Sequence, residues 1–354
     1  MDDKAPQQRV SLRDIGRLAN LSHSTVSLAL RDNPSIALKT RQRVRELAAS
    51  LGYVPDPMLR ALAEYRRDKS VRRYQGSLAW INNHYDPSNM DKHVELSLYW
   101  KGAEQRALEL GYKLVRFAPV AEKMSSASLR RILINSGIRG ILVGPQPESH
   151  AVWDFDFTGF SAMAFGFSLT SPQLHVVTNC QFRSSILAVR RLRANGSKRI
   201  GFILSDRLNQ ASEGNFLGGF LAEQNKSPAK DRIAPFIAIG LTEKEKVRFR
   251  HWFEAHRPDV LLCDFWEWTV AYLQEMGLRV PEDMPLAVLA ANPQSRRFAG
   301  IDQNAFKIGQ QAVDTVVGMI YRNETGVPET PTRILVEGRW QDGESTPVLQ
   351  NSPV

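Results

Sequence analysis

The stretch SHSTVSLALR, residues 22–31, decides how the first part of the chain folds. Val26, Ala29 and Leu30 recur at helical spacing. Ser22 suits a helix start, because its oxygen can accept from an amide two or three residues further on. The stretch has no acidic residue, as expected of a helix that lies against phosphates and base edges. It is therefore predicted to be a short helix that reads a nucleic acid.

Two more helices are predicted around this stretch. A capped helix start lies at Ser11–Asp14, and its apolar face is formed by Leu12, Ile15, Leu18 and Ala19. This helix ends at Asn20, which tolerates a positive φ in a tight turn. A third helix is expected over Thr40–Leu51, with Val44, Leu47, Ala48 and Leu51 facing the other two. Two short helices joined by a tight turn predict a helix-turn-helix.

Charge favours DNA binding over the alternative of a small helical cluster with no ligand. Residues 1–73 hold 15 Lys and Arg against 8 Asp and Glu, a net +7 of the chain's +9. A local concentration of positive charge is what release of counterions from DNA requires.

The same residues resemble a known family. The segments Ser11–Ile15, Ala19–Ser22, Thr25–Ser27, Thr40–Arg41 and Leu51–Pro55, with Val44, follow the headpiece pattern of the LacI-type (lactose/galactose repressor) transcription factors. Two departures are Asn20, where the family usually has Gly, and Ala37, where it usually has a capping Ser. The missing cap removes about 1 kcal/mol of stability.

The resemblance implies which side chains contact DNA. His23, Ser24 and Leu28 would read base edges, and Leu28 is apolar enough to contact a thymine methyl. The phosphate contacts would come from the hydroxyls of Ser22, Thr25, Ser27 and Thr40. Leu12 and Arg31 complete the expected DNA-contacting set of the headpiece.

A hinge helix is expected next. Asp56 is a good cap and Pro57 suits the first helical position. Residues 56–67 are too few for a helix that is stable alone, so this helix should form only with a partner copy and DNA. By resemblance Leu62 would wedge into the minor groove and kink the duplex. The alternative is an ordinary linker, and Asp56 and Leu59 depart from the family's usual Asn and Ala.

From Gly76 onwards the pattern is that of an α/β fold. Apolar runs such as Tyr112–Phe117 and Val260–Cys263 alternate with amphipathic stretches such as Val94–Leu110 and Glu243–His256. This rhythm predicts parallel sheet covered by helices, and its restart after Asn179 predicts two Rossmann-like lobes. The family resemblance continues in the segments Leu192–Ile200, Gly277–Asp283 and Ile301–Gln303, and at Gly309.

The expected organisation is an all-α helix-turn-helix headpiece and hinge helix, followed by a periplasmic-binding-protein-like domain. Residues 1–9 are expected to be disordered, 10–55 to form the headpiece, and 56–75 the hinge helix and linker. The first lobe should comprise 76–179 and 297–327, and the second 180–296 and 328–354. The family resemblance implies three crossings between the lobes, near residues 180, 297 and 328.

A small-molecule effector is expected between the lobes, because ligands of such folds bind outside the carboxyl ends of the strands. The candidate lining residues follow strand ends or match the family's sugar-contacting positions: Asn82, His84, Phe216, Asp264, Trp266, Trp268 and Asn292. Aromatic faces with a few hydrogen-bonding groups suit a sugar ring, although buried packing is the commoner role of a Trp.

The effector class stays open. Phe216 stands where the family's sugar binders usually carry an Arg, and Ala291 stands where they usually carry an Asp. Losing both groups argues against a standard set of monosaccharide contacts. A carbohydrate-related effector, a non-sugar metabolite and no ligand at all are the alternatives.

Other classes fit the sequence poorly. The glycine-rich nucleotide loops, the Gly-x-Ser-x-Gly nucleophile and the His-Glu-x-x-His zinc motif are missing from it. The seven histidines have no metal-ligand spacing, so no enzyme activity, metal or cofactor is expected. A solute-binding protein would need a signal peptide, and residues 1–9 have no such character. No run of 18 apolar residues exists.

The sequence thus predicts a cytoplasmic, bacterial DNA-binding regulator, most simply a repressor. Cys180 and Cys263 should be buried free thiols. The partners expected are a double-stranded, near-palindromic operator, a second copy of the chain and a small-molecule effector, with no membrane. Inducer and co-repressor remain alternatives, as do dimer and tetramer.

Overall fold

A computed structural model describes residues 12–30, 34, 36–51, 53, 76–86, 88, 92–295 and 297–346. The chain divides after Arg73 into two units. The hinge helix expected over 56–67 and the disorder expected over 1–9 lie outside the described residues.

The first unit contains the three helices that the sequence predicts. They are α1 (Leu12–Ala19), α2 (His23–Leu30) and α3 (Leu38–Ser50). Their shared core consists of five buried side chains, Ile15, Val26, Ala29, Val44 and Ala48. Leu18 was expected on the buried face of α1 and is instead 59% exposed. The buried stripe of this short helix is therefore narrower than its apolar residues indicate.

The turn between α1 and α2 has the predicted geometry. Asn20 adopts a φ of 56°, and the Leu21 amide donates to the Gly16 carbonyl at 2.9 Å. The Arg43 guanidinium of α3 donates to the Ala19 carbonyl at 3.0 Å. Two carbonyls at the end of α1 are thereby hydrogen-bonded, which is what a helix end inside a small domain needs.

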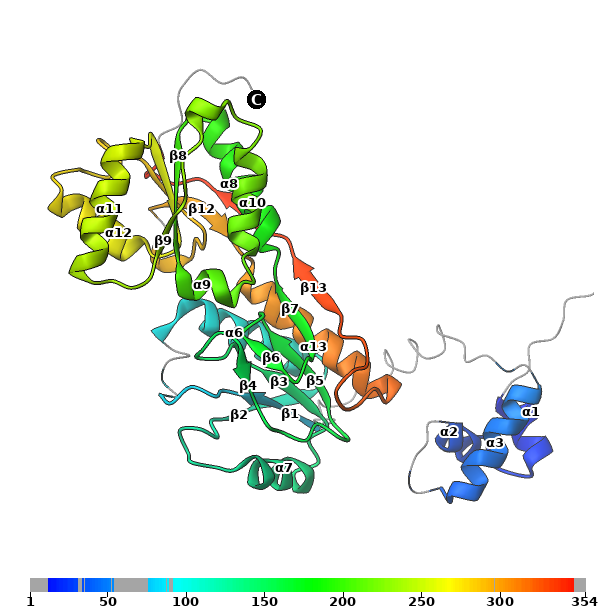
Figure 1. The fold of residues 1–354 in the computed structure, drawn as a ribbon. Coiled ribbons are helices and arrows are strands. Elements are labelled where there is room, and N and C mark those ends of the chain that lie inside the picture. The colour runs from blue at the N-terminus through cyan, green and yellow to red at the C-terminus, as the bar shows by residue number, and fades with distance from the viewer. Residues whose placement is uncertain are drawn as a thin grey trace, which may run out of the picture. The chain divides into compact units, whose positions relative to one another are not determined.

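The second unit has two lobes, each built on a six-stranded sheet (Figure 1). The first sheet is entirely parallel, in the order β13-β7-β5-β3-β1-β2. Its strands are β1 (Gly76–Ile81), β2 (Tyr112–Phe117), β3 (Gly140–Val143), β5 (Ser161–Phe165), β7 (His175–Asn179) and β13 (Arg333–Val336). Helices α6 (Val94–Glu109) and α13 (Ala305–Arg322) cover one face, and α7 (Ser126–Asn135) covers the other. A small separate sheet joins β4 (Ala151–Val152) to β6 (Leu169–Ser171).

The second sheet has the order β14-β12-β11-β10-β8-β9, and only β14 is antiparallel. Its strands are β8 (Ile200–Ser205), β9 (Phe236–Ala238), β10 (Val260–Cys263), β11 (Leu286–Val288), β12 (Ala299–Asp302) and β14 (Arg339–Gln341). One face packs against α8 (Gln181–Ala194) and α10 (Asn215–Gln224), and the other against α11 (Glu243–His256) and α12 (Trp266–Glu275). The short helix α9 (Asp206–Ala211) follows β8 directly, and two 3-10 turns lie at Ala229–Asp231 and Pro293–Ser295.

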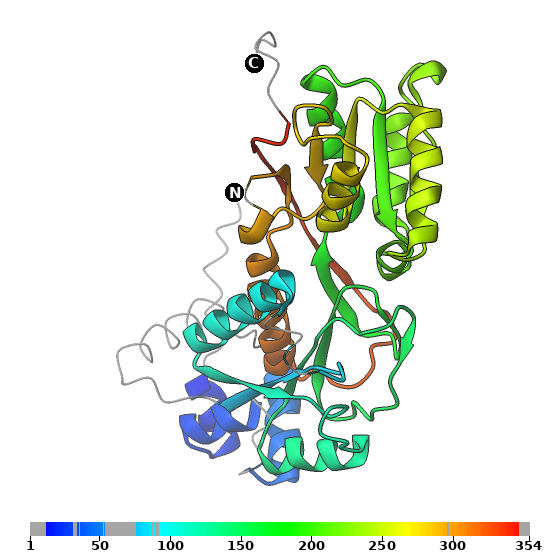
Figure 2. The ribbon, with the colours of Figure 1, turned by 90° about the vertical axis from the view of Figure 1, so that its left-hand side faces the viewer.

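Two of the three expected crossings between the lobes are misplaced. The strand β12 pairs with β11 in the second sheet, although residues 297–327 were assigned to the first lobe. The strand β13 pairs with β7 in the first sheet, although 328–354 were assigned to the second. The chain therefore crosses after β7, after β12 and after β13 (Figure 2). Apolar composition marks these strands, but only their hydrogen-bonding partners decide to which sheet they belong.

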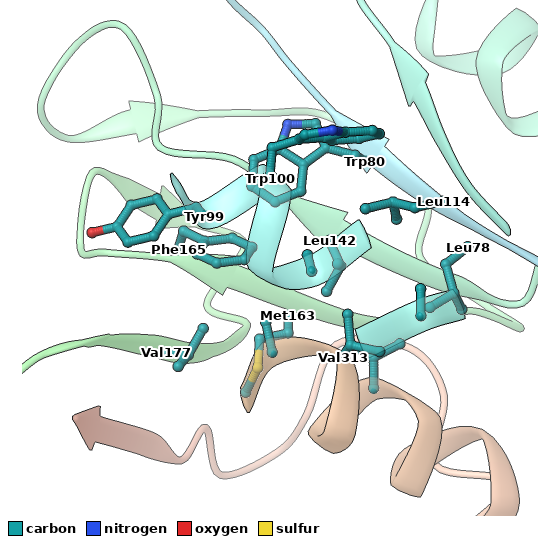
Figure 3. Close-up of a cluster of buried hydrophobic side chains, with 14 of the residues drawn as sticks. Leu78, Trp80, Tyr99, Trp100, Leu114, Leu142, Met163, Phe165, Val177 and Val313 are labelled. Carbon is teal, nitrogen blue, oxygen red and sulfur yellow. The ribbon is translucent and has the colours of Figure 1, made fainter. Parts of the chain in front are cut away.

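The first lobe has an apolar cluster on each face of its sheet, and the one beneath α6 and α13 contains the tryptophans Trp80 and Trp100. Trp80, Trp100 and Phe165 pack together between sheet and helix (Figure 3), with ring centroids 5.8 Å apart for Trp80–Trp100 and 4.8 Å for Trp80–Phe165. Glycines let α6 and α13 touch through their backbones. A Cβ at Gly102 would overlap the Phe306 carbonyl, and one at Gly309 would overlap the Tyr99 carbonyl. These two helices therefore move as one body.

Candidate functional site

The start of α2 is capped as the sequence predicts. The Thr25 amide donates to Ser22 Oγ at 3.1 Å, and the Ser22 and Thr25 hydroxyl oxygens lie 2.8 Å apart. The cap satisfies one of the amides that a helix start leaves without a partner. The start of α3 has no side-chain cap, because its cap position is Ala37.

One face of the helix α2 packs into the headpiece core. Val26 and Ala29 are fully buried, whereas Leu28 is half-buried and is not among the described side chains that pack on this core. His23, Ser24 and Ser27 lie within the bounds of the same helix. The helix carries no acidic residue, so the positions outside its buried face do not repel a phosphate backbone.

The remaining predicted DNA contacts lie on the neighbouring helices or outside the described residues. Leu12 begins α1, and it packs partly on the core, which limits what it can offer to DNA. Thr40 lies in the first turn of α3, half-buried, and its amide donates to the Ala37 carbonyl at 2.9 Å. Arg31 and Leu62 fall outside the described part of the chain.

In the first lobe, buried amides gather at the carboxyl ends of β1 and β3. Asn82 and Asn83 are 5% and 6% exposed, and Asn83 Nδ2 donates to Gln146 Oε1 at 2.9 Å. Gln146 Nε2 also donates to the Gly144 carbonyl, and the Gln146 backbone amide donates to Ser168 Oγ at 2.8 Å. Gln146 was not predicted, yet it follows an apolar run as Asn82 does, so the same rule could have found it.

His84 faces the second lobe. Its Nε2 lies 3.1 Å from the Pro145 carbonyl oxygen. Burial lowers the pKa of its imidazole, and the nearby positive charges of His93 and of Arg207, on α9, lower it further. Ser149 Oγ donates to the Arg207 carbonyl at 3.2 Å. Loops at the end of the first sheet therefore touch α9 of the second lobe.

Asp264 is bound internally. Its carboxylate accepts from Ser205 Oγ at 2.5 Å and from the Ser205 amide at 3.1 Å and 3.2 Å. Burial raises the pKa of Asp264 to about 6, against the hydrogen bonds from Ser205, which lower it. Ser205 also caps α9 by accepting from the Leu208 amide at 3.3 Å. Asp264 thus joins the end of β10 to the start of α9.

The three aromatic candidates differ in how far they are buried. Phe216 was expected to line the cleft, which is wrong: it is 2% exposed and packs with Phe202 and Phe220 beneath α10. Helical spacing turns Phe216 inward. Trp268 is half-buried and packs against Phe249, Phe265 and Tyr272 between α11 and α12. Trp266 is also half-buried, and its ring centroid lies 4.8 Å from that of Phe298.

Asn292 reaches across the lobes. Its Nδ2 donates to Glu95 Oε1 of α6 at 2.9 Å. It also borders a hollow of about 390 Å³ beside the crossing segments. The lining residues are Leu98, Ala291, Asn292, Pro293, Asp302, Asn304, Ala305, Phe306, Lys307, Arg339 and Gln341. None of the other predicted cleft residues lines it, so this hollow contains only one member of the predicted set.

Cys180 and Cys263 are buried free thiols, as predicted. Across the described ranges, no three His, Cys, Asp or Glu side chains are grouped so that they could hold a metal ion. The same ranges contain no helix whose length and apolar composition would let it cross a membrane.

Two family models match this chain: the bacterial regulatory proteins of the lacI family over residues 11–56, and a periplasmic binding protein-like domain over residues 189–346. The HTH-type transcriptional regulator MalR of Streptococcus pneumoniae serotype 4 is 23% identical over 325 residues, covering 89% of this chain and 94% of MalR. The sucrose operon repressor of Lactococcus lactis subsp. lactis is 22% identical over 255 residues, covering 72% of this chain and 74% of that repressor.

A solved structure has the same fold. The lac repressor dimer bound to operator and the anti-inducer ONPF superimposes with a TM-score of 0.55 at 16% identity, covering 96% of this chain and 99% of that one. The helix-turn-helix matches one model, the second lobe matches the other, and the relatives that span both units are regulators. This chain therefore combines a headpiece that matches the lacI family model with a periplasmic binding protein-like domain, and it is similar over most of its length to DNA-binding transcriptional regulators, not to enzymes.

Proposed function

We propose that the protein is a bacterial, cytoplasmic repressor that binds a near-palindromic operator as a homodimer. The observation that carries the proposal is the recognition helix α2, capped by Ser22, free of acidic residues and anchored by Val26 and Ala29. A dimer presents two such helices about one helical turn of DNA apart, so a two-fold protein selects a two-fold site.

In this proposal the side chains on and near α2 have two roles. His23, Ser24 and Leu28 read base edges in the major groove, and Ser22, Thr25, Ser27 and Thr40 contact phosphates together with Arg31. Support comes from the half-buried Leu28, which does not pack on the headpiece core. Leu62 would act as a minor-groove wedge from the hinge.

A second copy of the chain is the proposed partner of an apolar surface on the second lobe. Ile239, Leu241 and Val247 are 76%, 60% and 55% exposed, and they surround the turn between β9 and α11. The strand β9 is the edge strand of its sheet. Several large apolar side chains exposed together are characteristic of protein interaction sites, and the similar lac repressor is a dimer.

The proposed effector is a small molecule held between the lobes, with ligand and operator affinities coupled by the same factor. Asn82, His84, Asp264 and Trp266 remain the proposed lining. The buried amides and the half-buried Trp266 suit a sugar-like molecule, and the similar sucrose operon repressor is named for a sugar operon. The core position of Phe216 favours the alternative, a non-sugar metabolite, because the family's usual arginine contact has no counterpart there.

Selection of random duplex DNA by the purified full-length protein tests the DNA-binding proposal. We expect enrichment of a near-palindromic sequence at moderate salt, and a complex whose mass corresponds to two chains. Recovery of sequences no different from the input pool, with and without a panel of sugars and other metabolites, would contradict it.

A further inference from the structure

The hydrogen bond between Glu95 and Asn292 joins the two lobes. Glu95 lies in the first turn of α6, and Asn292 follows β11 in the second lobe. The Asn292 side-chain oxygen accepts from the backbone amides of Gln294 and Ser295 at 2.9 Å and 3.2 Å. The backbone amide of Asn292 donates to Ser295 Oγ at 2.9 Å. These bonds fix the orientation of the amide, so its Nδ2 is already aimed at Glu95 before the lobes meet.

Glu95 is held equally firmly. The helix that carries it touches α13 through the glycine contacts at Gly102 and Gly309, so Glu95 cannot shift without moving that helix pair. Because α13 follows the crossing after β12, the pair also lies at the pivot between the lobes. A change in the angle between the two lobes should therefore lengthen or break this hydrogen bond.

Two other interlobe contacts are weaker candidates for such a role. Arg333 and Glu213 form an ion pair at 3.1 Å, but their side chains are 57% and 40% exposed, and exposed pairs contribute little. Ser149 donates to the Arg207 carbonyl between neutral groups. The Glu95–Asn292 bond involves a charged acceptor, is half-buried, and borders the 390 Å³ hollow, where a change in packing can reach it.

We propose that Glu95 and Asn292 form an interlobe latch, a reversible contact that sets the equilibrium between lobe arrangements and, through it, operator affinity. This inference rests on the proposed function, and it gives Asn292 a positioning role in place of the ligand contact predicted from the sequence. A ligand shifts such an equilibrium only by its different affinity for the latched and unlatched states.

The test uses the full-length protein and the duplex that the wild type selects. Hydrogen exchange over residues 94–98 and 289–295 reports whether the latch forms, and operator dissociation constants report whether it regulates. We expect Glu95→Ala to speed exchange in both segments and to change operator affinity about fivefold, the scale of one charged hydrogen bond in partial contact with water. Glu95→Gln keeps an acceptor oxygen but loses the charge, so it should fall between the wild type and Glu95→Ala.

Glu104→Ala is the matched control, because Glu104 is exposed on the same helix. It should change neither readout. Asn292→Asp keeps the oxygen that accepts from Gln294 and Ser295 and removes only the donor to Glu95, so it should add nothing to Glu95→Ala in the double variant. Additive effects, or wild-type exchange and affinity in Glu95→Ala, would overturn the latch. If the wild type selects no duplex, the proposed function fails, while hydrogen exchange still decides whether the latch forms.

Discussion

The headpiece and the two-lobed unit reach their folds with very different cores. The core cluster of the described headpiece residues has five buried side chains, the largest of which is Ile15, whereas the first lobe alone packs 18 buried residues around Trp80 and Trp100 on one face of its sheet. A small domain buries a smaller share of its surface, so each core side chain carries more of its stability. We therefore expect the headpiece to be marginally stable and the two-lobed unit to be much more stable.

The largest expected effect comes from a change in the two-lobed unit at one of its close backbone contacts. Gly309→Ala places a Cβ on the Tyr99 carbonyl, which α6 and α13 can accommodate only by separating. We expect a loss of about 4 kcal/mol in the free energy of unfolding, measured by urea denaturation of the full chain. Gly318→Ala on the same helix is the control: its Cβ would meet only the flexible end of Arg322, so the stability should hold or rise slightly.

A core truncation should instead remove the headpiece alone. Ile15→Ala is expected to cost about 3 kcal/mol, comparable with the whole stability of so small a domain. Operator binding should be lost, while the main unfolding transition of the two-lobed unit stays in place. Leu18→Ala, at the 59% exposed position of the same helix, should leave both unchanged. Simultaneous loss of both transitions would show that the units are not independent.

The pH dependence of the two-lobed unit should contain a contribution from Asp264. Burial raises its pKa from 3.8 to about 6. Its contribution to stability is therefore fully present below pH 3.8 and is lost as the pH rises through 6, by about 3 kcal/mol in all. Relative to wild type, Asp264→Asn should gain most of this amount between pH 4 and pH 7 in thermal or urea unfolding. The exposed Asp154→Asn should track the wild type, and a parallel pH curve for Asp264→Asn would rule the contribution out.

The smallest expected effects concern the two helix starts of the headpiece. Ser22→Ala should lose about 1 kcal/mol of headpiece stability by removing the cap seen at the Thr25 amide. Ala37→Ser should gain about as much, because α3 begins without a side-chain cap. Hydrogen exchange within α2 and α3 measures both. A loss in each case would mean that the caps do not govern these helices.

Local patterns predicted most of the elements. The bounds of Tyr112–Phe117, Glu243–His256 and Val260–Cys263 agree with the sequence prediction, and so do the Ser22 cap and the positive φ of Asn20. These depend on periodicity, capping and turn chemistry, which act over a few residues.

The errors involve partners far apart in the chain. The sheet to which β12 and β13 belong depends on β11 and β7, more than ten and 150 residues away. Phe216 was predicted by position, but the helix that carries it turns it into the core, and Trp268 is half-buried and packs against the core cluster of the second lobe. The Asp264–Ser205 and Glu95–Asn292 contacts join segments 59 and 197 residues apart, and no local pattern indicates either pair.

The most direct test of DNA reading by α2 is a second selection from random duplexes, with His23, Ser24 and Leu28 replaced together by Ala, beside Thr25→Ala. The triple variant should fold, keep its salt-dependent affinity for DNA in general, and select a changed or relaxed sequence. Thr25→Ala should select the wild-type sequence with uniformly lower affinity. Return of the wild-type operator by the triple variant would contradict base reading by this helix.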